Sequence, residues 1–174
     1  MADSRSKKIV FVSHCLLNMN SKYEGTAKYP DVAPFLFDLL KKNDIGIEQI
    51  PCPELGMFEV SRKPATKEIY DTPGYRKVCK SYADFVARLA EKYKKAGYKV
   101  LAVIGVAGST SCGSMITHVG RDETEIKRRP GIGIFMEELQ KVIFDIPFVD
   151  FDFRNAQLSM KNIDKTIKMS DITV

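Results

Sequence analysis

The chain has 174 residues, of which 44% are hydrophobic and 28% are charged. This length suits one domain, and this composition excludes disordered, collagen-like and low-complexity classes. The formal net charge of +5 permits an anionic substrate or an RNA without requiring either. No apolar run approaches the ~20 residues of a membrane-spanning helix, and the short apolar run near the N-terminus is unlike a signal peptide. We therefore expect one cytoplasmic domain, residues 1–174, that does not enter a membrane.

Strands and helices are predicted to alternate along the chain, from apolar runs and from apolar positions with a helical period. Strands are expected at residues 8–12, 46–50, 99–106 and 147–151. Helices are expected at residues 32–42, 74–96 and 134–144, with another after Asn155. Apolar strands that alternate with helices indicate a parallel sheet covered on both faces. The predicted fold class is α/β, a single three-layer Rossmann-like domain with a mostly parallel sheet.

The longest predicted helix shows the strongest helical period. Its expected core-facing stripe consists of apolar positions three or four residues apart. These are Val78, Tyr82, Phe85, Val86, Leu89 and Tyr93. Cys79 is next to this stripe and is expected to be a half-buried helix residue.

Three of the four cysteines follow predicted strands. Cys15, Cys52 and Cys112 come after the first, second and third strand. Because the carboxyl ends of parallel strands meet at one ligand-binding edge, these thiols could meet in space. Three thiolates suit a zinc ion with one open position or an iron–sulfur cluster, and their spacing does not choose between them. A third interpretation is that they are small core residues.

Polar groups near two of these cysteines are candidates for chemistry. Side chains on a strand repeat every two residues, so Glu48 is expected on the same face as Cys52. A carboxylate beside a metal site is suited to proton transfer, although Glu48 could also be a solvated residue of an edge strand. The loop at residues 107–114 consists mainly of small residues, which allow a ligand to approach and whose hydroxyls can donate hydrogen bonds.

Three short runs contain these cysteines, in the order VSHCLLNMNSKYEG, PCPELGMFEVSRKPA and GSTSCGS, within residues 9–118. Together they resemble the thiouracil and 4-thiouridine desulfidase family. Its members carry a Ser-x-Cys-Leu-Leu opening with a downstream Tyr-x-Gly, then Cys-Pro-Glu with Arg-x-Pro, then a Ser-x-Ser-Cys-Gly loop. The chain departs from this pattern at His14, at Asn18 and over residues 54–58, so it resembles a divergent branch of the family.

The resemblance implies a [4Fe–4S] cluster with three cysteine ligands and one iron free of protein ligation. The implied ligands are Cys15, Cys52 and Cys112. It also implies a catalytic carboxylate and a catalytic serine. By their positions relative to the cysteines we place these at Glu48 and Ser109, with Glu54 of the Cys-Pro-Glu motif as the second candidate carboxylate.

The activity that the resemblance implies is a non-redox hydrolysis. A C=S group of a thiolated pyrimidine, either thiouracil or a 4-thiouridine that is free or within tRNA, becomes C=O with release of hydrogen sulfide. Arg62, Tyr23 and Ser111 are expected to bind the substrate. The alternatives are a non-catalytic iron–sulfur or zinc protein that senses or carries sulfide, and a mononuclear zinc hydrolase. A cysteine phosphatase is disfavoured, because Ser21 stands where an arginine would hold the phosphate.

Overall fold

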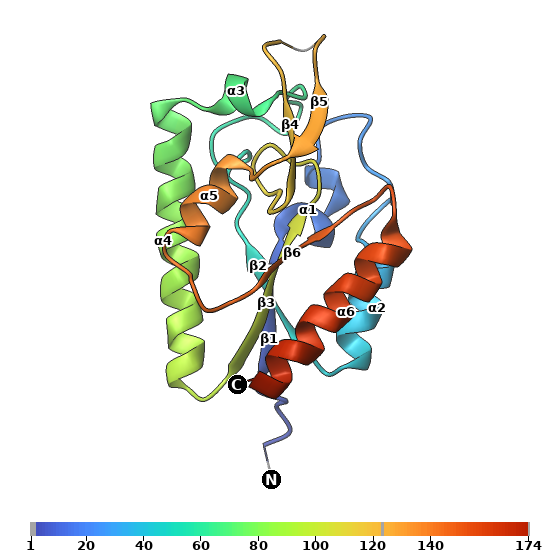
Figure 1. The fold of residues 1–174 in the computed structure, drawn as a ribbon, viewed down its shortest axis with the longest axis vertical. Coiled ribbons are helices and arrows are strands. Elements are labelled where there is room, and N and C mark those ends of the chain that lie inside the picture. Colours follow the sequence, from blue (N-terminus) through green and yellow to red (C-terminus); the bar gives the residue numbers. More distant parts are fainter. Residues whose placement is uncertain (1–2, 123, 174) are drawn as a thin grey trace.

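A four-stranded parallel sheet forms the centre of the domain (Figure 1). The computed structural model describes residues 3–122 and 124–173. The strands are β1 (Lys8–Ser13), β2 (Gly46–Ile50), β3 (Lys99–Val106) and β6 (Phe148–Phe151). They lie in the order β2-β1-β3-β6, and every neighbouring pair is parallel. The predicted strands and the parallel sheet are confirmed.

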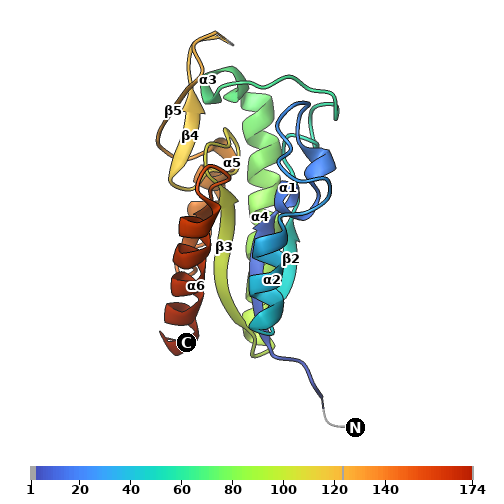
Figure 2. The ribbon, with the colours of Figure 1, turned by 90° about the vertical axis from the view of Figure 1, so that its right-hand side faces the viewer.

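Helices cover both faces of this sheet (Figures 1 and 2). One face packs against α2 (Pro34–Lys42) and α6 (Ala156–Thr173), and the other against α4 (Pro73–Lys95) and α5 (Ile134–Gln140). The pleat of the strands produces the two cores. In β1, Ile9 and Phe11 pack on the side of α4 and α5, whereas Val10 and Val12 pack on the side of α2 and α6. The three-layer α/β architecture is therefore confirmed.

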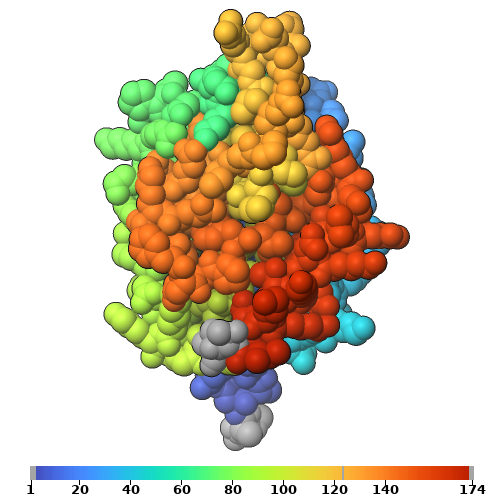
Figure 3. Space-filling view, viewed as in Figure 1, coloured from blue at the N-terminus to red at the C-terminus, as the bar shows by residue number. Residues whose placement is uncertain are grey.

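Shorter elements gather at the carboxyl ends of the strands. They are α1 (His14–Leu17), the 3-10 helix η1 (Met19–Ser21), α3 (Lys67–Tyr70), β4 (Ile116–Val119) and β5 (Lys127–Pro130). The antiparallel pair β4–β5 projects from the body of the molecule (Figure 3). This hairpin was not predicted, because the basic residues of β5 have the composition of a solvated loop. In the described part of the chain, no helix has both the length and the apolar character needed to cross a membrane.

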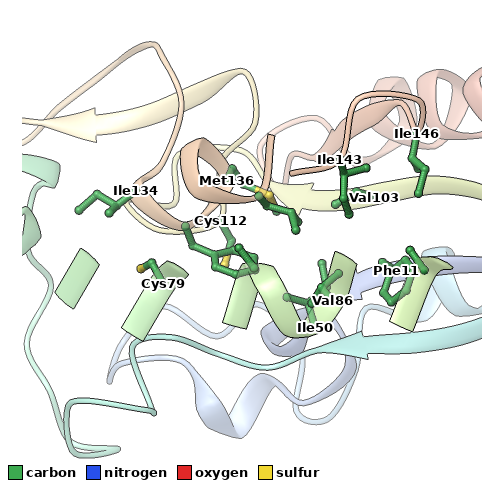
Figure 4. Packing of buried hydrophobic residues seen from close by; sticks show 14 of the residues in the cluster. Phe11, Ile50, Cys79, Val86, Val103, Cys112, Ile134, Met136, Ile143 and Ile146 are labelled. Carbon is green, nitrogen blue, oxygen red and sulfur yellow. The ribbon is translucent and has the colours of Figure 1, made fainter. Parts of the chain in front are cut away.

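The fully buried residues of α4 differ from the predicted stripe, and Figure 4 shows two of them, Cys79 and Val86, in the core. Its buried residues are Tyr75, Cys79, Ala83, Val86 and Ala90. The small side chains let the helix approach the layer beneath it, while the larger predicted residues lie on its flanks and Phe85 is 49% exposed. Of the predicted stripe, Val86 is buried, while Tyr82, Leu89 and Tyr93 are half-buried and pack against the core. The prediction was wrong at Phe85. Cys79 is fully buried, rather than half-buried as expected.

The strand β3 continues into a loop that folds back over it and carries Cys112. The N–H of Val106 donates to the carbonyl of Cys112 at 2.8 Å. At Gly105 an added Cβ would lie only 2.4 Å from that carbonyl oxygen and 2.5 Å from Asp150 Oδ1. Further along the loop, the Asp150 carboxylate accepts hydrogen bonds from Ser114 N at 2.8 Å and Ser114 Oγ at 2.6 Å. The loop is thus fixed directly against the strands.

We predict that Gly105→Ala lowers the free energy of unfolding by about 1–3 kcal/mol, because the added methyl group must displace the backbone of the Cys112 loop. The matched control is Gly74→Ala, where the added Cβ would lie 3.4 Å from the flexible end of Met57, an ordinary contact. Alanine is also the better helix former there. Urea unfolding followed by circular dichroism compares the two, and equal stability of Gly105→Ala and the wild type would contradict the prediction.

Candidate functional site

A cavity of about 120 Å³ lies at the carboxyl ends of β1, β2 and β3. In an open parallel sheet, ligands bind where the strand order reverses. Here β1 pairs with β2 on one side and with β3 on the other, so the cavity lies at that reversal. Its lining residues are His14, Cys15, Lys22, Tyr23, Cys52, Glu54, Arg62, Ala65, Tyr70, Val106, Ala107, Gly108, Ser109, Thr110, Cys112, His118 and Phe153.

The three cysteines that follow strands all line this cavity. Cys15 lies in α1, directly after β1, while Cys52 and Cys112 lie in the loops after β2 and β3. All are free thiols, with Cys112 buried and the other two half-buried. Cys79 is a free thiol too, but it lies in α4 and does not line the cavity.

Burial favours the neutral form of these thiols. It raises the pKa of Cys52 to about 11, and the nearby Glu54 carboxylate adds to this rise. Burial also raises the pKa of Cys15, and raises that of Cys112 well above its usual value, with the other two cysteines adding to the effect at Cys112. Thiolates here therefore need a positive partner, and a bound metal group supplies such a charge.

Glu54 presents a nearly buried carboxylate to the same cavity. It is 8% exposed, and both of its oxygens accept hydrogen bonds from the protein. Arg62 Nε donates to Oε2 at 2.7 Å, and Ser111 Oγ donates to Oε1 at 2.8 Å. Arg62 is held in turn by the carbonyl of Ser21, at 3.0 Å from Nη2. The carboxylate is thus fixed in orientation and paired with a cation, as a buried charge requires.

Glu48 does not lie beside the cysteines, contrary to the expectation from strand periodicity. It pairs with Phe11 halfway along the edge strand β2, and its carboxylate accepts a hydrogen bond from Tyr93 of α4. Cys52 lies four positions further along the chain, which corresponds to about 13 Å for extended backbone. The alternation ends because β2 ends at Ile50, before Pro51. Glu48 is not among the residues that line the cavity.

The remaining expected site residues lie in two different settings. Ser109 lines the cavity, and its Oγ accepts from the backbone N–H of Cys112 at 2.9 Å. Tyr23 and Arg62 line it as well, and burial raises the pKa of the Tyr23 hydroxyl. Ser111 instead is fully buried behind Glu54 and does not line the cavity. Its position suits holding Glu54 rather than contacting a substrate.

Sequence reasoning missed Lys22 and Phe153, which both line the cavity. Lys22 Nζ lies 5.0 Å from the centre of the Phe153 ring, a cation–π contact between two lining residues. His118 also lines the cavity, and burial lowers the pKa of its imidazole, aided by the charges of Arg154 and Arg128. Phe153 comes shortly after the last strand. Because ligands bind at the carboxyl ends of parallel strands, this position could have indicated that Phe153 lines the site.

The thiol donor set suits a metal group. Within residues 3–122 and 124–173, no three His, Cys, Asp or Glu side chains form a group that could hold a metal ion as they are placed. Cys15, Cys52 and Cys112 nevertheless line one cavity. Thiolates bind zinc and are the usual ligands of iron–sulfur clusters, so the chemistry of these side chains fits either group.

The fold and the site define an α/β domain with a thiol-lined pocket at the sheet reversal. The chain belongs to the putative 2-thiouracil desulfurase family, whose model matches residues 7–124. It is 32% identical over 168 residues to an uncharacterized protein, MJ0003, of Methanocaldococcus jannaschii, with 94% of this chain and 99% of that protein covered. Its fold is similar to that of a solved structure described as the [4Fe–4S]-dependent thiouracil desulfidase TudS. That similarity has a TM-score of 0.61 at 20% identity and covers 96% of this chain and 99% of the other.

We predict slow alkylation of Cys52 in protein prepared without iron. At pH 8 a thiol with a pKa of about 11 is about 0.1% ionised, whereas one with the usual pKa of 9.0 is about 10% ionised. The rate of iodoacetamide modification should therefore rise about tenfold per pH unit from pH 8 to 10, measured by mass spectrometry of the Cys52 peptide. Glu54→Gln should accelerate the reaction at a fixed pH, because it removes a negative charge. A plateau of the rate near pH 9 would contradict the prediction.

Proposed function

We propose that this protein is an iron–sulfur-dependent desulfidase that hydrolyses the C=S group of a thiolated pyrimidine. The products are the corresponding C=O compound and hydrogen sulfide, so water supplies the oxygen atom and both hydrogen atoms, and no electrons are transferred. The family supports thiouracil chemistry. The observation that carries the proposal is that three cysteines and one ion-paired carboxylate line the same cavity.

Cys15, Cys52 and Cys112 would hold a [4Fe–4S] cluster. When bound, such a cluster supplies a Lewis-acidic iron that can polarise a C=S bond. The cavity gives the substrate apolar walls as well. Tyr23, Tyr70 and Phe153 line it, and aromatic side chains suit a planar pyrimidine ring.

Glu54 is the carboxylate that we assign as general base. Its oxygens are fixed by Arg62 and Ser111, and each retains a lone pair that can accept a proton from water. A water deprotonated by Glu54 attacks the carbon of the C=S group, and the proton then passes to the departing sulfur. Glu48 was the first candidate for this role, but it lies halfway along the edge strand β2 and does not line the cavity.

Ser109 is the residue whose hydroxyl group we assign as a hydrogen-bond donor to the substrate. Its Oγ already accepts from the backbone N–H of Cys112, so its own hydrogen is available to donate. A substrate oxygen or ring nitrogen in the cavity would accept this hydrogen bond. The same contact orients the pyrimidine ring relative to Glu54, which is how positioning lowers a reaction barrier.

We predict that the iron content of single Cys→Ala variants distinguishes the three cluster ligands from Cys79. Cys15→Ala, Cys52→Ala and Cys112→Ala should each lose most of the iron after anaerobic purification, since each removes one of three thiolate ligands. Cys79→Ala is the matched control and should keep its iron and its visible absorbance. Iron and sulfide analysis measures both. Full iron content in all three ligand variants would overturn the assignment.

We predict that Glu54→Gln and Ser109→Ala lower sulfide release from thiouracil or 4-thiouridine by about 10²-fold or more while iron content stays at the wild-type level. Glu48→Gln is the matched control, because it makes the same change in the middle of β2, and it should stay within about twofold of the wild type. An assay of sulfide and pyrimidine product measures all three. A protein that binds iron but releases no sulfide from any thiolated pyrimidine would support the alternative function of sensing or carrying sulfide.

A further inference from the structure

Tyr75 is a fully buried tyrosine outside the cavity. It lies in the first turn of α4, where Thr72 Oγ1 accepts a hydrogen bond from its backbone N–H at 3.2 Å. The next residue, Arg76, donates to Asp71 at 2.6 Å and to Glu138 of α5 at 2.8 Å. The start of the helix is therefore fixed on both sides, and so is the position of the Tyr75 side chain.

A chain of two hydroxyl groups joins Tyr75 to Glu54. Tyr75 Oη lies 2.6 Å from Ser111 Oγ, and Ser111 Oγ donates to Glu54 Oε1 at 2.8 Å. A serine hydroxyl has one hydrogen, so when Ser111 donates it to Glu54, the Tyr75 hydroxyl is the donor in the first contact. Tyr75 and Ser111 are both 0% exposed. In such a dry setting, each hydrogen bond fixes the direction of the next.

The ring of Tyr75 also supports the segment that carries Glu54. Phe58 stacks on the Tyr75 ring with centroids 5.5 Å apart, and its backbone N–H donates to the carbonyl of Glu54 at 2.7 Å. The Tyr75 side chain thus supports Glu54 in two separate ways, through the packing of its ring and through the hydrogen bond of its hydroxyl group. A change from tyrosine to phenylalanine removes the hydroxyl and leaves the stacked ring in place.

We infer that Tyr75 is a positioning residue for Glu54 and acts through Ser111, an inference that rests on the proposed function. Arg62 fixes one carboxylate oxygen, and the hydroxyl chain fixes the other. Without the Tyr75 hydroxyl, the Ser111 hydroxyl is no longer held in one rotamer, and Glu54 can rotate about its contact with Arg62. The water that Glu54 activates is then misaligned with the C=S carbon.

The test compares two tyrosines of the same helix. Tyr75→Phe should lower kcat for sulfide release by about tenfold or more, because small misalignments of a catalytic group cost that much or more. KM should stay within about twofold, because Tyr75 does not reach the cavity. Tyr93→Phe is the matched control. It removes a hydroxyl that donates to Glu48, away from the cavity, and kcat should stay within about twofold of the wild type.

A double variant tests whether Tyr75 acts through Ser111. Ser111→Ala should lower kcat at least as much as Tyr75→Phe does. Adding Tyr75→Phe to Ser111→Ala should cause no further loss, because the link to Glu54 is already absent. Independent, multiplicative losses would overturn the inference. So would a loss of iron content or visible absorbance in Tyr75→Phe equal to its loss of activity, which would indicate a structural role alone.

The same assay separates the two proposals. If the wild-type protein releases no sulfide, the proposed function fails and the inference falls with it. If the wild type is active and Tyr75→Phe is equally active, only the inference fails.

Discussion

The parallel pairing of β1 with β2 on one side and with β3 on the other brings the three cysteine-bearing segments together. Ser13 and Ile50 end their strands opposite each other in the register, and each is followed by a cysteine two residues later. The third cysteine comes six residues after Val106. Its loop turns back so that the carbonyl of Cys112 reaches the N–H of Val106. Backbone hydrogen bonding therefore places all three thiols at one edge of the sheet.

The electrostatics of the cavity follow from this burial. Desolvation raises the pKa values of the three thiols, and the Glu54 carboxylate adds to the effect because it is a further negative neighbour. Arg62 offsets part of this rise in pKa, since it pairs with Glu54 and its positive charge favours the thiolate of Cys52. One guanidinium cannot compensate several buried anions. The thiolate forms of these cysteines would therefore need further positive charge, which a bound metal group would supply.

The sequence predicted the layers and the strands because their hydrophobic patterns are local. It also predicted the convergence of the cysteines, because strand ends meet at one edge of a parallel sheet. The placement of Glu48 was wrong because periodicity gives the face of a strand but not the distance along it. The role of Ser111 could not be predicted either. Its partners, Tyr75 and Glu54, lie 36 and 57 residues away in the chain, and only the packed structure brings them together.

The Cys112 loop also depends on elements beyond the region that matches the family model, which ends at residue 124. The carbonyl of Ser111 accepts from the N–H groups of Phe135 and Met136 in the first turn of α5, at 3.1 and 3.2 Å. The Asp150 carboxylate of β6 binds the loop just after Cys112. The first turn of α5 thus holds the backbone of Ser111 and the Tyr75 hydroxyl holds its side chain, while β6 holds Ser114 two residues beyond Cys112. Because Ser111 contacts Glu54 and adjoins Cys112, the residues after 124 help to fix the carboxylate and the thiol in one arrangement.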